Sequence, residues 1–273
     1  ITTKQGPMLQ AEYRQRLVNG AFMIRGAGIF QQDKDVFQRT DGTVTPGYRN
    51  FRGSVESTGQ FALNQKWVWG WDAVMLTDKT FFSDYNVSIR QTPIDPFQTG
   101  RSEGTSQLYL TGKGDRSFFD IRAQHFYGFS QFDKQKELPV IHPVMDYSYI
   151  FGQPVMGGEL GYKLNLTSLT RKDASFDPIT TLAQNNSLCG PLSADPAVKN
   201  TSNCLLRGIP GTYSRFSTEV TWKRSITDSF GQIFTPFAYV RADVASMDIR
   251  PQPGVSNYID TGESSFVRAM PTV

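Results

Sequence analysis

The chain has 273 residues, of which 38% are hydrophobic, 19% charged and 13% aromatic. It holds no run close to the roughly 20 apolar residues that a transmembrane helix needs, which excludes a protein that crosses a membrane with helices. The net charge of +3 comes from 28 basic and 25 acidic residues spread along the chain, without the basic cluster that contacts phosphates, so nucleic acid is not an expected partner.

The first predicted element is a strand over residues 9–18, in which apolar and polar side chains alternate from Leu9 to Leu17. Asn19-Gly20 follows and predicts a two-residue hairpin turn, because both residue types tolerate a positive φ. The return strand is expected over residues 21–31. Frequent aromatic residues, with 24 Gly and 15 Pro at short intervals, favour β-structure in the rest of the chain as well.

The same alternation recurs and predicts eleven strands in all. After the first hairpin, the expected strands cover residues 51–63, 66–76, 105–111, 119–124, 139–150, 158–170, 213–226 and 233–245, and the last begins near Ser265. Tight turns are expected at residues 19–20, 64–65, 112–115, 152–157 and 227–232. They alternate with long connections at about 32–50, 77–104, 128–138, 171–212 and 246–264.

This strict alternation of short and long connections is typical of an antiparallel transmembrane β-barrel of the outer-membrane type. A strand of about 9–11 residues is long enough to cross a bilayer when tilted. A soluble β-sandwich would also alternate apolar and polar residues, but it gives no reason for every long connection to lie at one end. Because eleven is an odd number and the closing FVRAMPTV reads as mid-strand, we expect an incomplete section of such a barrel.

The alternation assigns each strand one face toward lipid and one toward a wet lumen. Apolar side chains expected to point outward are Phe119, Ile121, Leu160, Leu164, Phe216, Val220 and Trp222. Charged side chains expected to face the lumen are Glu12, Arg14, Arg16, Arg25, Arg52, Glu56, Asp72, Asp120, Arg122, Glu159, Lys163, Arg215, Glu219, Lys223, Arg241 and Asp243. They would brace the interior or provide a polar path for a headgroup or small solutes.

The residues that could carry chemistry are few. By alternation His125 falls on the lipid side and His142 on the lumen side with Asp146, so no catalytic pair is expected. Neither Cys189 nor Cys204 has metal-ligand spacing, so no metal and no cofactor are expected. The two cysteines lie in a predicted surface loop rich in Asn, Ser and Pro, and in an oxidising compartment they would close that loop as a disulfide.

Long segments of the chain resemble the barrel domain of the LptD family of lipopolysaccharide-assembly proteins, also called organic solvent tolerance proteins, in its alphaproteobacterial forms. The segments that carry the resemblance are residues 2–30 (TTKQGPMLQAEYRQRLVNGAFMIRGAGIF), 52–85, 158–171, 204–224 and 228–243, and the closing RAMPTV. The resemblance covers essentially the whole chain and rests on no catalytic motif.

The resemblance implies a 26-stranded barrel in the outer membrane of a Gram-negative bacterium, plugged by the lipoprotein LptE. It would receive lipopolysaccharide from the periplasmic bridge protein LptA through an N-terminal jelly-roll domain. Residues 1–273 would then be a section of one barrel domain, without the jelly-roll domain, the first barrel strands and the C-terminal strands.

The implied function is insertion of lipopolysaccharide into the outer leaflet, with the headgroup passing through the polar lumen and no enzymatic step. The alternative is a general diffusion porin, although a porin would normally close within its own chain. An outer-membrane hydrolase is disfavoured by the separation of the two histidines.

Overall fold

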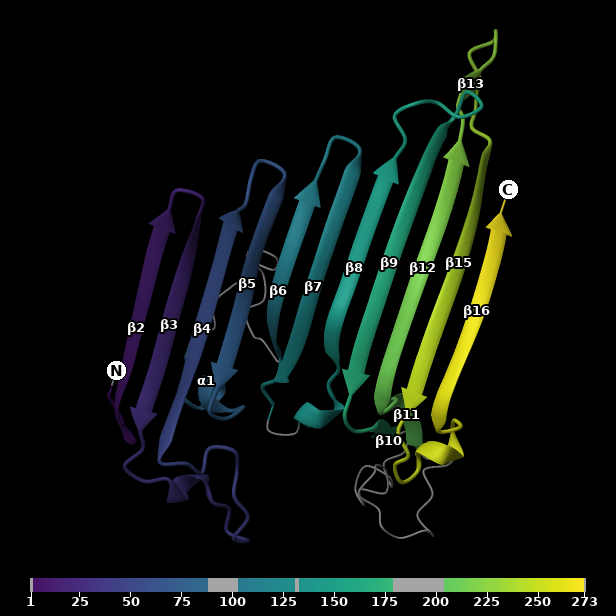
Figure 1. Ribbon diagram of the computed structural model, residues 1–273. Helices are drawn as coiled ribbons and strands as arrows, with labels where there is room; N and C mark the ends of the chain where they lie inside the picture. Colours follow the sequence, from purple (N-terminus) through teal and green to yellow (C-terminus); the bar gives the residue numbers. More distant parts are fainter. Residues whose placement is uncertain (1, 88–102, 131–132, 179–203, 273) are drawn as a thin grey trace. The chain divides into compact units, whose positions relative to one another are not determined.

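The computed structural model describes residues 2–87, 103–130, 133–178 and 204–272, and in them the chain is all-β and antiparallel, as predicted. Eleven strands of 10 to 13 residues occur in these ranges (Figure 1): β2 (Gly6–Leu17), β3 (Gly20–Phe30), β4 (Phe51–Ala62), β5 (Trp67–Leu76), β6 (Glu103–Lys113), β7 (Ser117–Gly128), β8 (Val140–Ile150), β9 (Glu159–Arg171), β12 (Gly211–Lys223), β15 (Phe237–Ile249) and β16 (Gly262–Thr272). Among the described residues, no helix is both long and apolar enough to cross a membrane.

The remaining elements are short. They are the strands β1 (Thr2–Thr3), β10 (Ser175–Pro178), β11 (Cys204–Gly208), β13 (Ile226–Thr227) and β14 (Ile233–Phe234), the helix α1 (Phe81–Asp84), and the 3-10 helices η1 (Asp35–Phe37), η2 (Gln135–Glu137) and η3 (Val255–Asn257).

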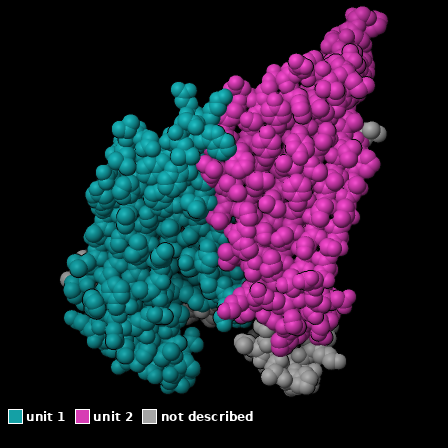
Figure 2. All heavy atoms as spheres, in the orientation of Figure 1, with its two compact units in different colours: residues 1–109, 124–138 teal, residues 110–123, 139–273 magenta. Residues whose placement is uncertain are grey.

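The chain forms two compact units, coloured separately in Figure 2. Unit 1 comprises residues 1–109 and 124–138, and unit 2 comprises residues 110–123 and 139–273, so β6 and β7 contribute to both. Within unit 1, β1 to β5 pair in chain order. Within unit 2, the order is β8, β9, β12, β15 and β16.

The first hairpin forms as predicted, but its turn lies one residue earlier than expected. Leu17 pairs with Gly20, so Val18 and Asn19 form the turn and Gly20 is already a strand residue. A Cβ atom at Gly20 would overlap the backbone oxygen of Gln60 on β4. This glycine is therefore required for the close approach of a neighbouring strand, and not for a positive φ in the turn.

Unit 1 has a buried core at the end of the strands where the long connections lie. The long connection after β5 carries α1, whose Phe81 and Phe82 are buried together with Ile29 of β3 and Val74 of β5. Phe82 also meets Phe129 edge-on, with 5.4 Å between ring centroids. The described part of this connection, residues 77–87, is thus folded against the strands.

In unit 2 the turn between β12 and β15 is longer than predicted. The predicted strands 213–226 and 233–245 are β12 and β15 at residues 211–223 and 237–249, so the connection covers residues 224–236. Within it, β13 pairs with β14 in the same register as β12 with β15. Between the two pairs of strands, the hydroxyl of Ser225 lies 3.3 Å from that of Thr235. The hairpin therefore continues as a two-stranded ribbon before it turns.

A register shift in β8 changes the position predicted for His142. Pairing with β9 shifts within residues 141–144, and the imidazole Nε2 of His142 lies 2.8 Å from the hydroxyl of Thr170. Thr170 and Asn165 are five residues apart on β9 and therefore lie on opposite faces, and Asp146 pairs with Asn165. The prediction that His142 shares the face of Asp146 is wrong, because the irregularity reverses the alternation between them.

Candidate functional site: the polar face of the strands

In unit 1, the charged residues predicted for the lumen share one face of the paired strands. Glu12 of β2 lies opposite Arg25 of β3, which in turn lies opposite Glu56 of β4. Arg25 therefore stands between two carboxylates in neighbouring strands, where opposite charges stabilise a sheet. The other predicted residues that follow this alternation are Arg14, Arg16, Arg52 and Asp72.

Arg52 lies on this face but is fully buried. Its guanidinium donates from Nε and Nη2 to the two carboxylate oxygens of Asp78, at 2.8 Å and 2.6 Å, and from Nη2 to Asp84 at 2.8 Å. Phe37 and Tyr85 lie over the guanidinium plane, with 4.7 Å and 5.1 Å to their ring centroids. Sequence alternation groups Arg52 with the other charged residues of this face but does not predict its burial, because the acidic partners lie in the segment after β5.

Tyr85 links the connection after β5 to the connection after β3 in unit 1. Its hydroxyl donates to Oε1 of Gln31 at 2.7 Å, and the amide of Gln31 donates to the carbonyl oxygen of Gly47 at 2.9 Å. Burial raises the pKa of the Tyr85 hydroxyl above its ordinary value of 10.0. The hydroxyl therefore remains a protonated donor at neutral pH.

In unit 2, the polar face is organised in rows that run across the strands. One row contains Asp146, Asn165, Ser217, Asp243 and Arg268, each opposite the next in the pairing register. The neighbouring row contains Ser148, Lys163, Glu219 and Arg241. Predicted residues from β9, β12 and β15 are thus brought together on one face, and the predicted Arg215 of β12 follows the same alternation.

Ion pairs join directly opposite residues of neighbouring strands on this face. Nζ of Lys163 donates to Glu219 at 3.0 Å, and Nζ of Lys223 lies 2.9 Å from the carboxylate of Glu159. Charges of both signs are therefore paired between β9 and β12, and neither sign dominates this part of the face.

Asp243 is the most enclosed charge on this face. Its buried carboxylate accepts a hydrogen bond from Nε of Arg241 at 3.1 Å and from Nη2 of Arg268 at 2.6 Å. Arg268 was not among the predicted site residues. Arg268 lies on the same face of β16 as Phe266 and Met270, and this alternation is the sequence signal that would have identified it.

Asp120 and Arg122 of β7 form a pair on their own strand. The guanidinium of Arg122 donates to both carboxylate oxygens of Asp120, at 2.7 Å and 2.8 Å, and the hydroxyl of Thr111 donates to Asp120 at 2.6 Å. Phe118 lies on the same face of β7 as both residues, and together with Asp146 it lines a pocket. These three β7 side chains therefore belong to the polar face of unit 2.

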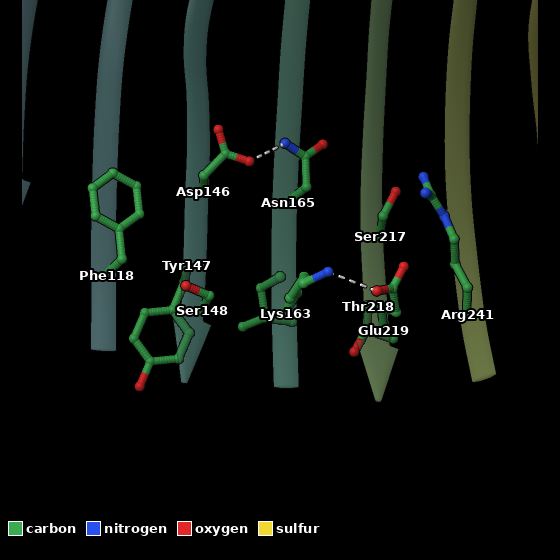
Figure 3. Close-up of a pocket in the computed structure, with 11 residues that line it drawn as sticks. Phe118, Asp146, Tyr147, Ser148, Lys163, Asn165, Ser217, Thr218, Glu219 and Arg241 are labelled. Atoms are coloured by element: carbon green, nitrogen blue, oxygen red, sulfur yellow. Dashed lines mark hydrogen bonds and ion pairs between the residues drawn. The ribbon is translucent and has the colours of Figure 1, made fainter. Parts of the chain in front are cut away.

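The pocket is an open hollow of about 190 Å³ on this polar face (Figure 3). The side chains that Figure 3 labels come from β7, β8, β9, β12 and β15. The lining residues are Phe118, Asp146, Tyr147, Ser148, Lys163, Leu164, Asn165, Ser217, Thr218, Glu219 and Arg241.

Comparison with known protein families identifies the chain. The model of the family described as LptD, LPS transport system D, matches residues 50–273, which is more than half of the chain. The chain belongs to the LptD family. A comparison with curated proteins finds no match.

Membership in the LptD family agrees with the all-β antiparallel fold, and the family consists of outer-membrane β-barrels that take part in lipopolysaccharide transport. LptD proteins are transport proteins and not enzymes. In the described part of the chain, no group of three or more His, Cys, Asp or Glu residues is placed to hold a metal ion.

The predicted disulfide stays a prediction. Cys204 is buried at the start of β11, and the hydroxyl of Tyr258 donates to its carbonyl oxygen at 2.6 Å. Cys189 lies outside the described residues. The assignment of the polar face to the lumen is likewise a prediction.

Proposed function

We propose that this LptD-family chain is part of an outer-membrane translocon that inserts lipopolysaccharide into the outer leaflet. In this proposal the polar faces of units 1 and 2 line the lumen, and the headgroup passes along them while the acyl chains stay with the membrane. Residues 1–273 belong to one barrel domain. No covalent step is required of the chain.

The observation that carries the proposal is the division of each strand into two chemically different faces in a chain of this family. On β12, Glu219 is paired with Lys163, whereas the adjacent Val220 belongs to the opposite, apolar face. Strands of 10 to 13 residues are long enough to cross a bilayer when tilted. Charged side chains on such strands need a wet interior.

Because the charges on this face are paired, the proposed path is polar but carries little net charge. Lys163 and Glu219 compensate each other, as do Lys223 and Glu159. A face of this kind solvates a sugar headgroup without the strong attraction that a face of one sign would exert on ions.

The resemblance of the chain to alphaproteobacterial LptD proteins supplies the partners. We propose that the lipoprotein LptE plugs the completed barrel and that the bridge protein LptA delivers lipopolysaccharide through the N-terminal domain. Membrane lipid surrounds the apolar face. Nucleic acid and cofactors have no part in this function.

The test is depletion of the full-length protein in its own cells. We expect less lipopolysaccharide at the cell surface, measured by labelling intact cells, and greater sensitivity to large hydrophobic antibiotics. A general diffusion porin would instead change the uptake of small solutes and leave surface lipopolysaccharide unchanged. Unchanged surface lipopolysaccharide after depletion would overturn the proposal.

A further inference from the structure

We propose that the pocket in Figure 3 is a subsite for an uncharged sugar unit of the transported headgroup. The inference rests on the proposed function, since it assumes that the polar face meets the headgroup. It goes further by assigning one place on that face to neutral sugar and not to phosphate.

The pocket brings hydrogen-bond donors and acceptors together on neighbouring strands. Figure 3 shows Asp146 beside Asn165 and Lys163 beside Glu219, from two adjacent rows of the sheet. Neighbouring strands lie about 4.8 Å apart, which is close to the width of a sugar ring. Because a hydroxyl group both donates and accepts hydrogen bonds, a ring that bridges two strands meets suitable partners on both sides.

Polar groups of the pocket keep hydrogen-bonding capacity for a ligand. Nδ2 of Asn165 donates to Oδ1 of Asp146 at 2.7 Å, which leaves Oδ2 of Asp146 as an acceptor. Lys163 uses one of its three ammonium protons on Glu219. The pocket therefore offers both acceptors and donors that are already held in place by their neighbours.

An aromatic side chain, Phe118, lies at the edge of the charged rows. The backbone N–H of Ile150 donates to the carbonyl oxygen of Arg116 at 2.9 Å, and this antiparallel register carries Phe118 to a position opposite Ser148. Phe118 is partly exposed on the polar face. An exposed ring offers an apolar surface against which the C–H groups of a sugar can pack.

The charge of the pocket excludes phosphate as the preferred ligand. Its carboxylates, Asp146 and Glu219, are matched by Lys163 and Arg241, so the formal charges of these four residues cancel. Arg241 is further occupied by Asp243 at 3.1 Å. A phosphate would lie near two carboxylates, whereas a neutral sugar incurs no such repulsion.

The experiment measures binding of a neutral oligosaccharide of glucose and galactose to the full-length protein in detergent, by saturation-transfer NMR. We expect Phe118→Ala to weaken binding by roughly tenfold, because the sugar loses its packing against the aromatic ring. The matched controls are Phe119→Ala, on the opposite face of β7, and Phe266→Ala, on the polar face of β16 outside the pocket. Both should leave binding unchanged.

Three results would overturn the subsite: no binding to the unsubstituted protein, equal loss in Phe118→Ala and either control, or tighter and salt-sensitive binding of a phosphorylated form of the same oligosaccharide. Phe118→Leu removes the ring but keeps an apolar side chain, and it provides the same test if Phe118→Ala does not assemble. Depletion remains a separate test, so loss of the subsite leaves the transport function standing.

Discussion

The guanidinium of Arg52 in β4 binds both carboxylate oxygens of Asp78, which follows β5, and neither side chain exposes more than 1% of its surface. Asp84 of α1 joins the same guanidinium at 2.8 Å. A strand residue and the loop that folds over it are therefore joined by a buried ion pair. Such a pair is costly to break, because removing one partner leaves the other charge buried.

Arg52→Ala should release the connection that contains α1. We expect a loss of about 3–5 kcal/mol in local stability, because Asp78 would be left buried without its partner. Limited proteolysis of the full-length protein should then cut between β5 and β6. Arg14→Ala is the control, since the pair of Arg14 with Glu12 is exposed and worth at most about 1 kcal/mol. Equal protease sensitivity of the two variants would contradict this role of Arg52.

Asp243→Ala should weaken the attachment of β16 to β15. The carboxylate of Asp243 is completely buried and holds Arg241 and Arg268, which are themselves partly exposed, so the loss of these charged hydrogen bonds should cost about 1.5–3 kcal/mol. The temperature at which the full-length barrel unfolds in detergent measures this loss. Glu159→Ala provides the comparison, because its pair with Lys223 is about half exposed and should contribute less than about 1 kcal/mol. The prediction fails if both variants unfold at the same temperature.

Neighbouring residues of β12 should differ in their access to water. We expect Glu219→Cys, but not Val220→Cys, to react with a membrane-impermeant thiol reagent when the full-length protein is in membranes. The reason is that the side chains of adjacent strand residues point to opposite faces. The unsubstituted protein gives the background from Cys189 and Cys204. Ready labelling of Val220→Cys with protection of Glu219→Cys would reverse the assignment of the faces.

Cys189 and Cys204 should be joined in protein purified without reductant. A disulfide that closes about fifteen residues should stabilise the loop by roughly 3 kcal/mol in the chain-entropy model. Peptide mapping by mass spectrometry after alkylation should find the two cysteines in one linked fragment. Alkylation of both thiols before reduction would show that the loop is not closed.

The sequence by itself determined the all-β class and the approximate positions of the eleven long strands. Side chains in a strand alternate between faces with period two, so the pattern around Glu219 and Val220 can be read without tertiary information. The family resemblance of the chain was also visible in its sequence, and the match over residues 50–273 confirmed it.

Only the tertiary structure decided which charges are buried and which residues meet. Arg52 and Arg14 look alike in an alternating pattern, but only Arg52 is covered by the connection after β5. The sequence predicts Gly20 to be a turn residue, whereas the structure shows that its missing side chain lets the backbone of Gln60 approach closely. Alternation reports the face on which a side chain lies. Burial and partners depend on loops and strands that are distant in sequence, and these meet only when the chain folds.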